Sequence, residues 1–157
     1  MKKLFALILA VVMIATMSTT AFAANTTGGS TEVSFNVDPT YTVTIPATVE
    51  LERQDNNDTV TYENHYTIGA NAGVRLKKNE YIEVTIASDF EMTTEQGATL
   101  DYTITKGRDA VATGGVVATF GTDKNAQSTA IHIAANDPDY AGEYKDTVTF
   151  TVAVKTN

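Results

Sequence analysis

The chain has 157 residues and a formal net charge of −8, with 19 acidic against 11 basic side chains, and it contains neither cysteine nor tryptophan. The acidic balance disfavours nucleic acids and anionic membrane surfaces as partners, because both select clusters of Lys and Arg. The lack of cysteine excludes disulfides, thiolate nucleophiles, cysteine-ligated metal centres and lipid attachment through sulfur. The length suits one domain with a core that needs no covalent staple.

The first 23 residues have the three zones of a secretory signal. Lys2 and Lys3 precede an apolar run over residues 4–14, and a small-residue stretch ends with Ala21-Phe22-Ala23. The apolar run is shorter than the roughly 20 residues that span a bilayer. We therefore expect cleavage after residue 23, with no membrane span afterwards, and a protein that is secreted or held at the cell surface.

The next residues, 24–31, are small and polar and are expected to form a flexible leader to a single domain over residues 32–157. In that domain, Val33, Phe35 and Val37 alternate with polar residues, and an Asp-Pro turn separates them from a similar run over residues 41–45. Alternation with a period of two is typical of half-buried strands.

The same alternation predicts long strands at 82–86, 100–104 and 148–154, and shorter ones at 59–62, 66–70, 90–93, 116–120 and 129–134. Threonine, whose β-branch suits a pleated surface, is frequent in these runs. Turn clusters rich in Asn, Asp and Gly separate them, among them residues 55–58 and 136–142. Many short strands joined by turns predict an antiparallel sandwich.

The approach to the last predicted strand contains Gly142 and Tyr144, with Asp139 upstream. This Gly-x-Tyr sequence resembles the tyrosine corner of immunoglobulin-like sandwiches, in which the tyrosine hydroxyl bonds to the backbone a few residues earlier. The resemblance implies structural roles for Gly142 and Tyr144. The expected fold is therefore an all-β, antiparallel, immunoglobulin-like β-sandwich that follows a signal peptide.

The residues 141–152, Ala-Gly-Glu-Tyr-Lys-Asp-Thr-Val-Thr-Phe-Thr-Val, are similar to the closing strand of several exported bacterial sandwiches. Together with Tyr41-Thr42-Val43-Thr44-Ile45-Pro46-Ala47, they resemble small exported surface proteins of the spore coat U-like, WxL-like and pilin-like kinds. The resemblance implies a β-sandwich exposed at a bacterial surface.

Two strand orders are open at this point. If Tyr144 opens the penultimate strand of an immunoglobulin-like order, one sheet edge is exposed. The leader with Val33 to Val37 of another copy can then fill it, as a donated strand does in pilins, and a homo-oligomer results. If Tyr144 begins the last strand instead, the sandwich closes on itself.

We find no catalytic set. The two histidines, His65 and His132, are expected to be surface or cross-strand residues, since His132 lies between Ile131 and Ile133 in an alternating run. No serine lies in a nucleophile motif, and the carboxylates between residues 80 and 95 are explained as a solvated face. The chain is not expected to be an enzyme.

No cofactor is expected, with calcium as the one candidate ion. Ca²⁺ prefers hard oxygen ligands from loops, and two loops supply them through Asp55 and Asp58, and through Asp137, Asp139 and Glu143. Asn and Asp are also ordinary turn residues, which explains both loops without an ion.

The leading interpretation is an exported, non-catalytic module with a structural or adhesive role at the bacterial cell surface. Its partners would be a protein or glycan of the cell envelope or extracellular space. The alternative is a carbohydrate- or peptide-binding module, with exposed tyrosine rings as stacking platforms: Tyr62, Tyr66, Tyr81 and Tyr140.

Overall fold

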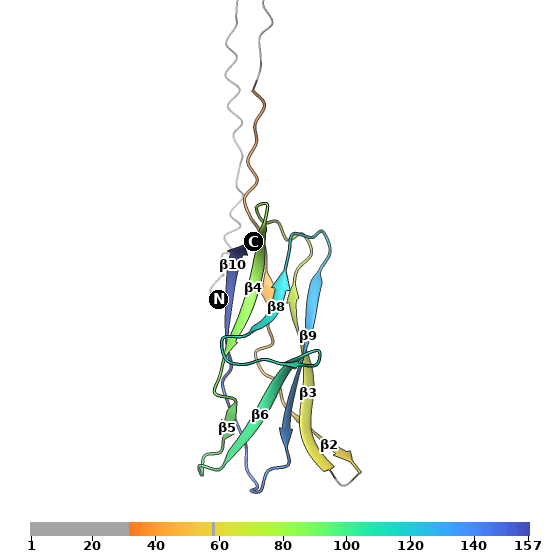
Figure 1. The fold of residues 1–157 in the computed structure, drawn as a ribbon, viewed down its shortest axis with the longest axis vertical. Helices are drawn as coiled ribbons and strands as arrows, with labels where there is room; N and C mark the ends of the chain where they lie inside the picture. Colours follow the sequence, from red (N-terminus) through yellow and green to blue (C-terminus); the bar gives the residue numbers. More distant parts are fainter. Residues whose placement is uncertain (1–31, 58) are drawn as a thin grey trace, which may run out of the picture. The chain divides into compact units, whose positions relative to one another are not determined.

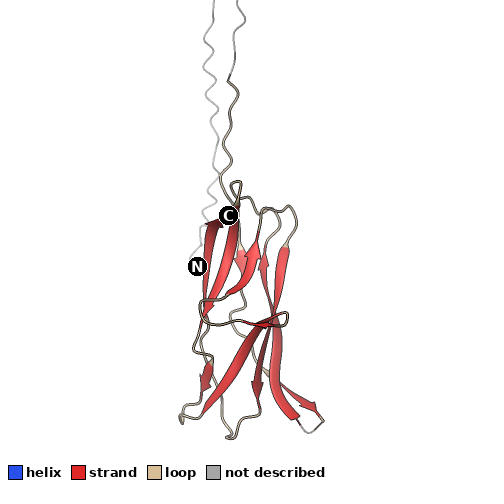
Figure 2. Ribbon diagram, viewed as in Figure 1, coloured by secondary structure: helices blue, strands red, loops and turns tan. Residues whose placement is uncertain are grey.

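The computed structural model describes residues 32–57 and 59–157, and every regular element in that part of the chain is an antiparallel β-strand (Figures 1 and 2). The predicted signal and leader, together with Asp58, lie outside the described residues. The chain divides into two units, Met1–Phe35 and Asn36–Asn157, and all the strands belong to the second. None of the described residues belongs to a helix that is long and apolar enough to cross a membrane.

The strands of the second unit form two sheets. The seven-stranded sheet has the order β1 (Val43–Thr44), β3 (Thr59–Ala70), β9 (Gln127–Asn136), β6 (Thr99–Lys106) and β5 (Glu91–Thr93), with β2 (Glu52–Asn56) paired to β3 and β7 (Asp109–Ala110) paired to β6. The three-stranded sheet has the order β10 (Thr149–Thr156), β4 (Glu80–Ala87) and β8 (Val116–Phe120), which lie side by side in Figure 1.

This order is that of an immunoglobulin-like sandwich, as predicted. In such sandwiches strands A, B, E and D form one sheet, and C, F and G form the other. The path β1-β3-β9-β6 corresponds to A-B-E-D, while β4 and β10 take the places of C and F. Among the described residues, no strand lies in the G position beside β10. Tyr144 precedes β10, which is the last strand of the described residues, and the outer edge of β10 has no partner strand among them.

The core lies between the two sheets. It is built from the apolar residues of each alternating run, every second residue, which we call the inward phase of the strand. Ile82, Val84 and Ile86 of β4 are at most 1% exposed, and Ile68 of β3 and Ile131 of β9 are fully buried. Their polar neighbours point to the outer faces. Because burying each such side chain contributes about 1.5–3 kcal/mol, the interior holds the sheets together without a disulfide.

The tyrosine-corner residues fix the turn that precedes β10. The Tyr144 hydroxyl donates to the carbonyl oxygen of Tyr140 at 2.9 Å, which is the bond that the resemblance implies. A Cβ atom at Gly142 would lie 2.8 Å from Cγ2 of Thr94, a buried residue, so the close approach of the turn to Thr94 requires glycine.

Three expectations for strands and turns differ from the structure. Residues 33–37 belong to no strand, because no strand of the described chain pairs with them. The predicted strands 59–62 and 66–70 are one strand, β3, because Asn64 occupies the inward phase and donates to the Glu50 carbonyl oxygen at 2.6 Å. The predicted turn at 55–58 begins later, since Asp55 and Asn56 pair with β3 as the end of β2.

Candidate functional site

The outer edge of β10 is the longest unpaired strand edge in the described part of the molecule. β10 pairs with β4 along all 8 of its residues, whereas the other edge strands, β1, β2, β5, β7 and β8, have 2 to 5 residues. Proteins protect edges with charges, prolines, bulges or short strands, because free N–H and C=O groups are a template for another chain. Residues 149–154 contain neither a charge nor a proline, so this edge is open to a further strand.

The inward face of β10 is also uncovered. Val152 lies opposite Val84 and Val154 lies opposite Ile82, and residues opposite each other in a ladder point to the same face. The two β4 residues are completely buried, yet Val152 is 37% exposed and Val154 is 39% exposed. These valines therefore point toward the core side of the sheet at a place where the sandwich has no covering strand.

The inward face continues into the closed core through Phe150. Phe150 packs against the buried core, and its ring meets the Tyr66 ring of β3 edge to face, with the ring centroids 6.5 Å apart. Tyr66 is only 8% exposed, so the prediction of an exposed stacking ring at this position is wrong: Tyr66 occupies the inward phase of β3. Burial raises the pKa of Tyr66 to about 12.

The Tyr66 hydroxyl has no hydrogen-bond partner among the described residues. A buried unpaired hydroxyl is costly, and its removal with the ring retained can be neutral or stabilising. We therefore expect Tyr66→Phe to leave the midpoint of urea unfolding unchanged or to raise it, by up to about 1 kcal/mol in free energy of unfolding. A loss of more than about 1 kcal/mol would show that the hydroxyl has a partner, such as a bound water.

The described residues of the N-terminal segment have the complementary pattern. Val33 and Phe35 are each 89% exposed and Val37 is 51% exposed, while the intervening Ser34 and Asn36 are polar. A run with three large apolar side chains on one phase and polar ones on the other is suited to a strand with one buried face. Segment 32–37 thus has the side-chain pattern of a β-strand with one buried face, although it belongs to no strand among the described residues.

A hydrogen-bond network holds the residues that lead into β10, and the sequence alone did not predict it. Tyr102 of β6 and Ser88, which follows β4, donate to the same Oδ2 atom of Asp146 at 2.6 and 2.8 Å. The Thr147 amide donates to Oδ1 of Asp146 at 2.6 Å. Partial burial raises the pKa of Asp146, but these hydrogen bonds outweigh it and hold the pKa below its usual value. Burial, and then the bond to Asp146, raises the pKa of Tyr102.

The same network holds a strained turn between the sheets. Phe90 has a φ of 62°, a left-handed conformation that bulky residues rarely adopt. Its amide donates to Ser88 Oγ at 2.8 Å, its carbonyl oxygen accepts from the Tyr102 amide at 3.0 Å, and its ring meets the Tyr102 ring at 5.8 Å. Ser88, Phe90, Tyr102 and Asp146 therefore connect both sheets to the residues that lead into β10.

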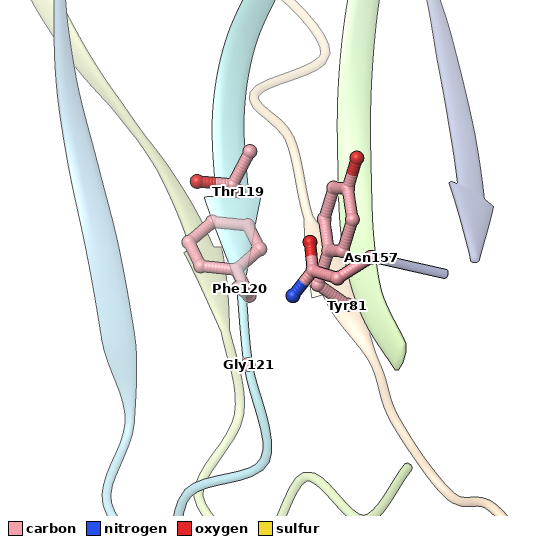
Figure 3. Close-up of a pocket in the computed structure, with 5 residues that line it drawn as sticks. All are labelled: Tyr81, Thr119, Phe120, Gly121 and Asn157. Atoms are coloured by element: carbon pink, nitrogen blue, oxygen red, sulfur yellow. The ribbon is translucent and has the colours of Figure 1, made fainter. Parts of the chain in front are cut away.

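The other predicted tyrosine platforms lie on separate elements. Tyr62 is half-buried on β3, and Tyr140 is 69% exposed in the turn before β10. Tyr81 lines a shallow pocket of about 390 Å³ with Thr119, Phe120, Gly121 and Asn157; in Figure 3 its ring and Asn157 face the β8 residues. In the described part of the chain, no aromatic pair joins these three rings, so they do not form a shared stacking surface.

The candidate calcium ligands are dispersed as well. Asp55 pairs with Arg53 at 2.9 Å and Glu143 pairs with Lys145 at 2.8 Å, while Asp137 and Asp139 are exposed. Asp58 lies outside the described residues. Across residues 32–57 and 59–157, no group of three or more His, Cys, Asp or Glu side chains is placed to hold a metal ion.

The two histidines meet across strands. His65 lies opposite His132 in the β3–β9 ladder, and their rings stack with centroids 4.4 Å apart. Nε2 of His132 lies 2.8 Å from Oε2 of Glu63. The sequence predicted outward or cross-strand histidines but gave no sign that two residues so far apart in the chain are paired.

No protein-family model matches the chain. No curated protein matches it either. Among solved structures, the chain is similar to the P pilus rod subunit PapA, with 8% identity, a TM-score of 0.47, and coverage of 68% of this chain and 100% of that one.

A second similar structure comes from work titled "Chaperone-tip adhesin complex is vital for synergistic activation of CFA/I fimbriae biogenesis". Here the identity is 13% and the TM-score 0.41, with coverage of 74% of this chain and 42% of that one. We base the proposal below on the strand order and exposed side chains of the present chain.

Proposed function

We propose that this protein is a non-catalytic structural subunit of the bacterial cell surface, and that its copies assemble by strand addition. In this assembly, segment 32–37 of one copy pairs with the outer edge of β10 in another. The observation that carries the proposal is the pair Val152 and Val154, which point toward the core side of the sandwich and are still more than a third exposed.

The donor and acceptor surfaces match in kind. The acceptor offers a free backbone edge of 8 residues with an apolar inward face, and the donor offers apolar side chains on one phase of an extended segment. Main-chain hydrogen bonds supply affinity in such strand addition, and alternate side chains supply specificity. The predicted signal peptide supports a location outside the cytoplasm, where the assembled subunits would have their structural or adhesive role.

The test compares the mature protein, residues 24–157, with a form that lacks residues 24–37. All strands and the buried core lie within residues 43–156, so the shortened form retains the complete folded unit. We expect light scattering after size exclusion to show oligomers for the mature protein and a monomer for the shortened form. We also expect the shortened form to bind a synthetic peptide of residues 24–38.

Identical monomers in both cases, with no binding of the peptide, would contradict the proposal. A mature protein that is monomeric while its shortened form binds the peptide would indicate that the segment folds back on its own β10. That result would contradict assembly between copies, but it would still show that the edge of β10 accepts the segment.

A further inference from the structure

We infer the direction and register of the added strand: it runs antiparallel to β10, with Val33 opposite Val154, Phe35 opposite Val152 and Val37 opposite Phe150. This inference rests on the proposed function and deepens it, because it identifies which residues of one copy meet which residues of the next. The partner is a second copy of this chain, and the interaction surface is the outer edge of β10.

The direction follows from the architecture. Every strand pair in the described chain is antiparallel, and the missing G strand of an immunoglobulin-like sheet runs antiparallel to strand F, here β10. An antiparallel neighbour of β10 also continues the alternating direction of the β10-β4-β8 sheet.

The register follows from the side chains. A shift by one residue would turn Phe35 to the outer face and lose the apolar contact. A shift by two residues in one direction would leave Val154 uncovered, and in the other it would bring Pro39 opposite Phe150. Among antiparallel registers, only the inferred one places all three apolar donor residues opposite the three apolar residues on the inward face of β10.

The charges agree with this register. It places Glu32 of the donor opposite Lys155 of the acceptor, on the outer face of the sheet. Lys155 is half exposed, and its Nζ lies 3.8 Å from Oε1 of Glu83, so it has room for a second carboxylate. Between them, Ser34 lies opposite Ala153, and both are small. A parallel strand would also bring a carboxylate, Asp38, next to Lys155, and would place Ser34 next to Thr151, so the charges support the register while the direction rests on the architecture.

Single cysteines distinguish the two directions, because the chain has none of its own. Residues directly opposite in an antiparallel pair have Cα atoms roughly 4.5–5.5 Å apart, within the range of a disulfide, whereas diagonal neighbours lie beyond it at roughly 7–8 Å. We propose to fold a Ser34→Cys copy together with an Ala153→Cys copy of different mass, oxidise the mixture mildly and analyse it on a non-reducing gel. The matched control mixes Ser34→Cys with Thr151→Cys.

The expected result is a mixed disulfide between the Ser34→Cys and Ala153→Cys copies that forms at least about tenfold faster than in the control mixture. Faster linkage in the control would overturn the antiparallel direction in favour of a parallel strand. If neither mixture links although light scattering shows oligomers, the register is wrong while the proposed function stands. If neither mixture forms oligomers, the proposed function fails with it.

Discussion

Phe35→Asp is expected to abolish assembly and to leave the fold of each subunit unchanged. Phe35 is 89% exposed in the chain itself, so its replacement removes no core contact. In the proposed assembly, the ring is buried against the inward face of β10. Loss of about 2–3 kcal/mol of burial weakens the contact by about 30- to 150-fold, and a buried unpaired charge weakens it further. Sedimentation would measure the oligomers. Thermal melting of the variant and of the original sequence, both without residues 24–31, would show whether the fold is unchanged.

The matched control is Ser34→Asp, which adds the same charge one residue away. Ser34 has the opposite phase, so its side chain would point to solvent in the added strand, and we expect assembly to persist. If the two variants behave alike, the effect comes from charge alone, and the apolar phase of the segment has no role in assembly.

Asp146→Asn is expected to give the largest loss of stability among the polar substitutions that we consider. The Tyr102 and Ser88 hydroxyls share one oxygen of Asp146, at 2.6 and 2.8 Å, and Tyr102 is 6% exposed. Hydrogen bonds to a charged acceptor contribute about 1.5–3 kcal/mol each, and asparagine keeps only one acceptor oxygen, so either the two hydroxyls or the Thr147 amide would face an NH2 donor. Because Asp146 is itself exposed, solvent weakens these bonds, and we expect the free energy of unfolding in urea to fall by about 1–2 kcal/mol at neutral pH. Asp139→Asn, at an exposed position in the preceding turn, should change it by less than about 0.5 kcal/mol.

The same substitution should alter the response to acid. The pKa of Asp146 is lowered in the folded protein, so its stabilising effect is complete above the unfolded pKa and is lost as the pH falls through the folded value. The difference in stability between the original protein and Asp146→Asn should therefore shrink as the pH drops below about 4. A difference that stays constant down to pH 2 would show that the ionised carboxylate does not carry the effect.

The strands with one buried face could be predicted from the sequence because their apolar residues alternate. β4, β8 and β10 lie within two residues of the predicted runs, and their inward phases, such as Ile82, Val84 and Ile86, are the buried ones. β2 could not be predicted in this way, since Glu52–Asn56 contains no apolar residue and is a strand only because it pairs with β3.

The long-range polar contacts could not be predicted, because they leave no periodic pattern in the sequence. Asn64 interrupts the apolar phase of β3, and its partner, the Glu50 carbonyl, depends on how the chain returns. The Ser88, Tyr102 and Asp146 network joins three distant parts of the sequence, and the pairing of His65 with His132 depends on the register between β3 and β9. None of these is periodic, so each requires the folded topology.

The N-terminal segment shows the opposite case. Its alternation correctly indicates an apolar phase at Val33, Phe35 and Val37, but alternation does not say which sheet covers that phase. Val33 and Phe35 are each 89% exposed, and residues 33–37 belong to no strand among the described residues. In the assembly that we propose, this segment of one copy pairs with the open edge of β10 in another, and its apolar side chains are buried there.

Amide hydrogen exchange of β10 tests this assembly most directly. Free edge N–H groups exchange rapidly, and pairing with an added strand protects them. In the mature protein, the segment that covers residues 149–156 should exchange at least about tenfold more slowly than in the form without residues 24–37. β8, at the opposite edge of the same sheet, should exchange equally in both. If the mature protein is oligomeric and β10 exchanges as fast as in the shortened form, the copies are joined elsewhere and strand addition at this edge is contradicted.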